Sequence, residues 1–241
     1  MISCILLFYL SGFAWTAGQA PADPDALYRQ RDDLASARRA ADIWAQRVQA
    51  NPQDFEAAWK QARANYWLGG HAPSNERKVL LEAGVAAGRT AAALQPDRPE
   101  GHFWTAANMG ALAESFGLRQ GLKYRGDIRD ELLTVLKLDA SFQQGSADRA
   151  LGRWYFKVPG LFGGSRKKSE EHLRKSLGYN ANSIASRYFL AETLLDMDRK
   201  AEAISELQKV LDLPADPDWL PEDTDFKRQA QRLLATLRQK R

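Results

Sequence analysis

A spacing that recurs along the chain constrains its fold more than any other feature. Four apolar segments of helical character each end near a proline or a small residue, at Pro52, Pro96, Ala140 and Ala181. The intervals are 44, 44 and 41 residues, and a small residue follows ten positions after each end, at Ala62, Ala106, Ala150 and Ala191. Self-similarity of this period predicts an array of two-helix units, in which the small residues let helices approach closely.

The composition favours the same architecture. The strong helix formers Ala, Leu, Arg, Glu and Gln dominate, and no β-branched run alternates with a period of two. The net charge of +4 is too small to indicate nucleic-acid binding, so we expect no nucleic-acid partner. We predict an all-α superhelix of four degenerate helix pairs with additional terminal helices, forming one domain over residues 21–241.

The apolar pattern predicts the bounds of the helices. One long helix is expected over residues 25–50, and a basic C-terminal helix, after an acidic Pro-rich linker, over 222–241. The pairs between them are expected at 54–69 with 75–94, 99–117 with 121–138, 142–157 with 165–178, and 183–197 with 200–213. Asp54 and Ser141 are predicted N-caps. The buried stripe of the helix over 121–138 is predicted to consist of Leu133, Leu136 and Leu138.

The last unit, residues 183–217, is the clearest repeat. Ala191, Ala203 and Leu207 fall where a 34-residue tetratricopeptide (TPR) repeat has small, small and large residues. The segment around Trp59 and Tyr66 is similar to the start of that repeat, although the usual Leu-Gly pair is missing. The repeats are therefore TPR-like but degenerate.

The segment GRWYFKVPGLFGGSRKKSEEHLRKSL, residues 152–177, raises the question of a phosphate-binding loop. Such a loop has the pattern Gly-x4-Gly-Lys-Ser/Thr after a strand, whereas this segment follows a helix and does not match the pattern. We interpret it as a helix-to-helix turn, in which Pro159 ends one helix and Ser165 caps the next. Three glycines permit left-handed backbone there, namely Gly160, Gly163 and Gly164. Leu161 and Phe162 are expected to return to the core. Anion binding beside Arg166, Lys167 and Lys168 is the alternative.

Aromatic residues recur on the first helix of the units. Trp59, Phe103 and Tyr188 stand three positions before a small residue, and Trp67 and Trp154 lie further along such helices. Because the first helix of each pair lines the concave face of a helical-repeat array, these five aromatics are candidates for a partner- or ligand-binding groove. The alternative is that they fill space between helix layers, since a register shift of one residue moves Trp59 from the groove to the core.

The sequence carries no recognisable catalytic or metal-binding pattern. His71, His102 and His172 are not spaced as metal ligands, and Cys4 is the only cysteine. We predict no catalytic residue, no metal and no cofactor. The leading hypothesis is a non-catalytic protein- or peptide-binding module. A carrier of a small apolar ligand and an enzyme are the alternatives.

The two ends of the chain carry separate signals. Residues 1–20 combine an uncharged apolar run, Cys4 to Trp15, with small residues after it, which is typical of a signal peptide. We therefore expect an extracytoplasmic location, or a membrane anchor if the segment is not cleaved. Residues 226–241 contain six basic residues and no acidic one, with an apolar stripe of Leu233, Leu234 and Leu237. This pattern indicates a capping helix, and peripheral contact with an anionic membrane is the alternative.

Three short motifs resemble one group of degenerate TPR proteins. They are Gly101-His102, Leu151-Gly152-Arg153 and Val158-Pro159-Gly160, within a similarity that covers about residues 27–213. The group includes the T component of TRAP transporters and the repeat region of regulator-of-microtubule-dynamics proteins. The resemblance implies a helical solenoid that acts by binding, without catalysis. For the T component it also implies an exported protein that partners a solute-binding transporter subunit. Homo-oligomerisation stays open.

Overall fold

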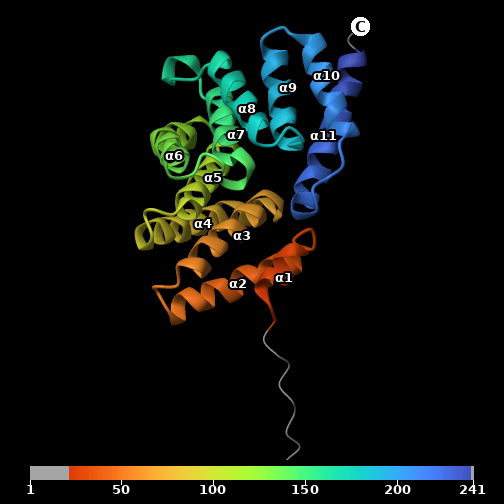
Figure 1. Cartoon of the computed structure of the whole chain (residues 1–241). Helices are drawn as coiled ribbons and strands as arrows, with labels where there is room; N and C mark the ends of the chain where they lie inside the picture. The colour runs from red at the N-terminus through yellow and green to blue at the C-terminus, as the bar shows by residue number, and fades with distance from the viewer. Residues whose placement is uncertain (1–21, 240–241) are drawn as a thin grey trace, which may run out of the picture.

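The computed structural model describes residues 22–239 of the 241-residue chain (Figure 1). The predicted signal peptide lies outside the described residues. Within them the chain forms helices and no strand, so the predicted all-α fold is confirmed. The α-helices are α1 (Pro24–Arg29), α2 (Leu34–Ala50), α3 (Phe55–His71), α4 (Ser74–Leu94), α5 (Pro99–Ser115), α6 (Leu118–Leu138), α7 (Phe142–Lys157), α8 (Arg166–Tyr179), α9 (Ile184–Asp196), α10 (Lys200–Asp212) and α11 (Leu220–Gln239). Short 3-10 helices cover Gly160–Phe162 and Pro217–Trp219.

The helices stack as TPR-like pairs. Each of α3, α5, α7 and α9 packs against the helix that follows it, as the sequence predicts for two-helix units. The first helices of the pairs also contact one another in the order α3, α5, α7, α9, and so form a continuous inner layer. The pairs rotate progressively along the chain, which gives the superhelical arrangement in Figure 1.

The prediction of one long helix over residues 25–50 is wrong. The chain turns between α1 and α2, because the Asp33 carboxylate accepts hydrogen bonds from the backbone N–H groups of Ala35 and Ser36 and starts a new helix there. The indole Nε1 of Trp67 donates to the Arg31 carbonyl at 2.6 Å and fixes the turn against α3.

Two of the three predicted caps are confirmed. The Asp54 carboxylate accepts from the N–H of Ala57 at 2.9 Å, and the Ser165 hydroxyl accepts from the N–H of Lys168 at 3.3 Å. The prediction for Ser141 is wrong, because its hydroxyl donates to Asp139 instead and makes no capping bond. Residues 143–145 then adopt positive φ angles of 43°, 60° and 79°, so the regular part of α7 begins only after them.

The buried stripe of α6 differs from its prediction. Leu133 is 46% exposed and Leu138 is 37% exposed, and of the predicted leucines Leu136 alone packs against the core. The buried positions are Tyr124, Ile128, Leu132 and Val135, which pack against α5 and α7. The stripe is shifted by one residue from the predicted one, so a rotation of about 100° separates the two faces.

The last helix brings the two ends of the array together. Helix α11 packs against α9 and α10, and its N-terminal end reaches the level of α1 and α3 (Figure 1). There the Arg31 guanidinium binds the Glu222 carboxylate and the carbonyl of Asp218. We call this contact of Arg31, Asp218 and Glu222 the terminal clasp.

Candidate binding groove

A cavity of about 750 Å³ lies on the inner side of the superhelix. Its walls come from α5, α6, α7, α9 and α11, and Tyr28 and Tyr66 reach it from α1 and α3. We call this cavity the inner groove. Most of its wall is apolar, because the inner helices carry aromatic residues and small residues such as Ala106, Ala111 and Ala185.

Three of the five predicted aromatics line the inner groove. Phe103, Trp154 and Tyr188 all contribute to its wall, although each is more than nine-tenths buried. They therefore pack between helices with most of their surface and present only a small part to the groove. These three side chains therefore both line the groove and fill space between helices, so each of the two sequence-based hypotheses applies in part.

Trp67 and Trp59 lie elsewhere. Trp67 is 4% exposed, does not line the groove, and stacks on His71 with ring centroids 3.6 Å apart. Trp59 lines a second pocket at the N-terminal end of the array, where its ring lies 5.0 Å from the Arg63 guanidinium. The structure thus brings Phe103, Trp154 and Tyr188 to one site and leaves the other two aromatics outside it.

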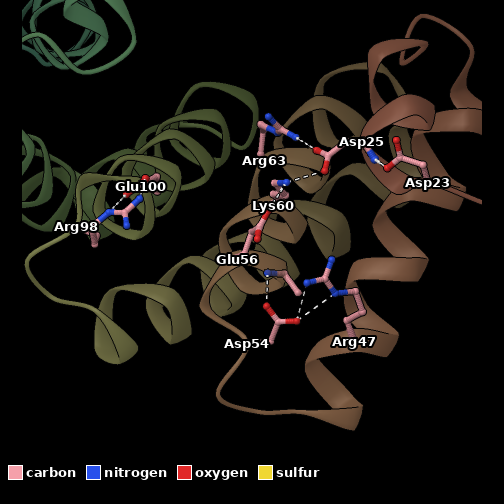
Figure 2. A network of polar contacts seen from close by, with 10 residues as sticks. Asp23, Asp25, Arg47, Asp54, Glu56, Lys60, Arg63, Arg98 and Glu100 are labelled. Carbon is pink, nitrogen blue, oxygen red and sulfur yellow. Dashed lines mark hydrogen bonds and ion pairs between the residues drawn. The ribbon is translucent and has the colours of Figure 1, made fainter.

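The second pocket is polar, and its charges are already paired. The Lys60 ammonium lies 2.6 Å from Asp25 Oδ2 and 2.5 Å from Glu56 Oε1 (Figure 2). Arg47 pairs with Asp54 at 2.9 Å and Arg98 with Glu100 at 2.5 Å. Because these charged side chains pair with one another, we interpret them as a structural network that joins helices and not as a ligand site.

The glycine-rich turn has a structural role beside the groove. Pro159 lines the groove, and Gly163 takes a left-handed φ of 102°. A Cβ atom on Gly164 would lie 1.7 Å from the Val158 carbonyl oxygen, so only glycine fits there. The expectation that Leu161 returns to the core is wrong, since its side chain is 90% exposed.

The structure gives no support to the anion-binding alternative at this turn. The Arg166 guanidinium donates to the Phe156 carbonyl and pairs with Asp196, so it is not free to bind an anion at the start of α8.

Among residues 22–239 no cluster of three or more metal-binding side chains is present. None of the helices described is both long enough and apolar enough to cross a bilayer.

Sequence reasoning missed the contribution of α11 to the groove. Phe226 lies 5.4 Å from the Tyr188 ring and 5.2 Å from the Phe189 ring, measured between centroids, so α11 forms a wall and not only a cap. Asp223 and Gln229 of the same helix also line the cavity. The apolar stripe of the C-terminal helix was visible in the sequence, but its distant partners were not.

Sequence reasoning also missed the cations of the groove. Arg153, on α7, pairs with Glu114 of α5 at 3.0 Å and with Glu192 of α9 at 2.6 Å. These two ion pairs tie the three inner helices together at the groove wall. Arg149 lies one turn earlier on α7 and also lines the groove. Lys157 at the end of α7 and Arg125 of α6 line the groove as well, so the described wall carries three cations from α7 and one from α6.

Residues 22–168, more than half of the chain, match the family described as "Regulator of microtubule dynamics protein 1-3". The chain belongs to this family. The matched region begins before α1 and ends in α8, so it contains the turn at residues 158–165 and the α5 and α7 walls of the inner groove. No curated protein matches the chain.

Solved structures similar to this family member are TPR proteins. A thermophilic TPR protein of Thermus thermophilus aligns with a TM-score of 0.67 and 23% identity, over 88% of this chain and 97% of that chain. A crystal structure of MamA aligns with a TM-score of 0.50 and 14% identity, over 83% of this chain and 95% of that chain. At these identities the likeness shows the fold, and it agrees with the TPR-like repeats predicted from the sequence.

Proposed function

We propose that this protein is a non-catalytic interaction module that binds an extended segment of a partner protein in the inner groove. The observation that carries the proposal is the groove itself, a cavity of about 750 Å³ whose wall includes aromatic residues of α5, α7, α9 and α11. Burial of apolar side chains in such a cavity contributes about 25 cal/mol per Å² of apolar surface removed from water. An extended segment with apolar side chains would therefore gain affinity along the whole wall.

The second part of the proposal concerns which protein the partner is. We infer that the protein is exported and serves as an accessory component of a TRAP-type uptake system, with a solute-binding subunit as its partner. The apolar run at Cys4 to Trp15 and the motif similarity to the T component support this inference.

The test combines cross-linking in native cell envelopes with a variant that fills the groove. Ala111→Trp places a large ring at the groove wall, and Ala201→Trp on the exposed face of α10 is the matched control. We expect the wild type and Ala201→Trp to cross-link to the same partner and Ala111→Trp to lose it. Recovery of a solute-binding subunit supports the transporter role, and recovery of another partner through the groove supports only the interaction module. Equal capture by both variants would contradict the groove as the docking site.

A carrier of a small apolar ligand is the second candidate. The groove volume lies within the range of about 300–1,000 Å³ that is usual for small-molecule sites. Native mass spectrometry of the purified protein tests this candidate. A co-purified ligand that is absent from Ala111→Trp supports it, and a spectrum of bare protein for both forms argues against it.

A further inference from the structure

Arg149 is a cation without a protein partner at the wall of the inner groove. It lies on α7, it is largely buried, and its guanidinium makes no hydrogen bond and no ion pair with any residue the structure describes. Arg153, one turn later on the same helix, is bound by two carboxylates. Among the described residues, the groove therefore pairs Arg153 with two carboxylates and gives Arg149 none. Arg125 of α6, which also lines the groove, has no ion pair there either.

The two acids whose charges act on Arg149, Asp223 and Glu222, are engaged elsewhere. Glu222 belongs to the terminal clasp, and the Asp223 carboxylate accepts the backbone N–H of Asp216 at 2.9 Å. Burial lowers the pKa of Arg149, although Tyr66, Asp223 and Glu222 oppose that effect. A partly buried cation of this kind is costly unless an anion accompanies it. A bound partner can therefore supply the anion that Arg149 lacks.

A set of side-chain amides lines the same groove. Gln143 and Gln144 come from the left-handed start of α7, and Asn180 and Asn182 come from the turn before α9. The Oε1 atom of Gln143 is buried and accepts no hydrogen bond. Side-chain amides both donate and accept, so they match the N–H and C=O groups of an extended backbone. A hydrocarbon chain offers them no partner.

We propose that the segment bound in the inner groove is an acidic peptide, in which one Asp or Glu carboxylate pairs with Arg149. The guanidinium can bind that carboxylate with two parallel hydrogen bonds. The amides of Gln143 and Asn182 hold the peptide backbone, and a neighbouring apolar side chain packs against the aromatic wall. This inference rests on the proposed function, because it names the class of partner for the same groove.

The experiment selects binders from a phage library of random twelve-residue peptides on the immobilised full chain. The wild type is compared with Arg149→Gln and Arg149→Lys, and Arg129→Gln on the exposed face of α6 is the matched charge control. We expect Asp or Glu at one fixed position of the wild-type and Arg129→Gln binders. A synthetic peptide of that sequence should bind Arg149→Gln about 10- to 100-fold more weakly, because a charge-assisted hydrogen bond is lost. Arg149→Lys should recover part of the affinity.

The outcomes separate this inference from the function on which it rests. Groove-dependent peptides without an acidic position, or equal binding to wild type and Arg149→Gln, would overturn the inference and leave the interaction module intact. Failure to enrich any peptide, together with saturable binding of dodecanoate, would overturn both in favour of the carrier. The melting temperature of Arg149→Gln should not fall, since Arg149 has no partner among the described residues to lose. Weaker peptide binding by this variant could then not be attributed to unfolding.

Discussion

Arg31 and Glu222, which are 191 residues apart, form a two-bond ion pair that joins the ends of the superhelix. Arg31 Nη2 lies 2.5 Å from Glu222 Oε2, and Arg31 Nε lies 2.9 Å from Glu222 Oε1. The Arg31 guanidinium is also held between the rings of Tyr28 and Trp67, at 5.0 and 5.4 Å from their centroids. Because α11 is both the last helix and one wall of the inner groove, this pair holds that wall in place.

We predict that Arg31→Met destabilises the protein by about 3 kcal/mol, because it leaves the partly buried Glu222 carboxylate without its counter-ion. Urea unfolding followed by circular dichroism measures the change. The matched control is Arg29→Met, whose side chain is 71% exposed and lies 3.9 Å from Asp23. That variant should change stability by less than about 1 kcal/mol. Equal effects of the two variants would show that the terminal clasp does not stabilise the fold.

The turn at residues 158–165 gives a second prediction. Gly164→Ala places a Cβ atom 1.7 Å from the Val158 carbonyl oxygen. The backbone fixes the positions of both atoms, so no side-chain rotation can relieve the overlap. The expected loss of stability is about 2 kcal/mol, typical of a forced overlap. Gly160→Ala is the control, since no heavy atom lies within 4 Å of its Cβ position. Thermal unfolding distinguishes them, and a Gly164→Ala protein as stable as Gly160→Ala would refute the steric argument.

Much of the fold was predictable because its determinants are local. Helix ends carry their own signals, as at Asp54 and Ser165, where the side chain caps the backbone that follows it. The period of the small residues then predicts pairing, because helices adjacent in the chain pack together. The left-handed residues 143–145 escaped prediction, since they pack against a distant part of the chain: a Cβ atom on Gly145 would lie 2.7 Å from the ring of Tyr179 in α8.

The groove was less predictable because distant residues build it. The pattern of aromatics placed Phe103, Trp154 and Tyr188 on the inner helices, but it could not show that Phe226 of α11 would meet Tyr188. Nor could composition separate Arg149 from Arg153, which are identical side chains one turn apart. Only the positions of Glu114 and Glu192 on other helices decide which of them is paired.

A third prediction concerns Asn108, which is fully buried and joins α5 to α3. Its side-chain N–H₂ group donates to the carbonyls of Ala62 at 3.0 Å and Trp104 at 2.8 Å. Asn108→Asp keeps the shape but replaces the donor by a carboxylate, which faces two carbonyl oxygens. We expect a loss of about 3 kcal/mol at neutral pH, because a buried charge is left unpaired.

The pH dependence of this variant has a definite sign. Burial should raise the pKa of the introduced carboxyl above its value in the unfolded chain, so the deficit of Asn108→Asp relative to wild type should shrink as the pH falls from about 8 to about 4. Urea unfolding at both pH values measures it. Asn75→Asp, exposed in the first turn of α4, is the matched control and should be neutral or slightly stabilising. A deficit that does not depend on pH would mean that lost packing, and not the charge, is responsible.

Tyr28 of α1 gives the last prediction, because it is buried beside two cations, Arg31 and Arg63. Burial raises the pKa of Tyr28 to about 12, although the charges of Arg63 and Arg31 act in the opposite direction. In the unfolded chain a tyrosine ionises near 10, so the stability that the neutral phenol contributes is complete below about pH 10 and is lost between about 10 and 12. Tyr28→Phe should therefore remove part of the steep alkaline loss of stability, by up to about 3 kcal/mol at about pH 12. Urea unfolding across this alkaline range measures the slope, with Tyr179→Phe at an exposed phenol as the matched control. If Tyr28→Phe keeps the full wild-type slope, ionisation of Tyr28 is not what opens the N-terminal end of the array.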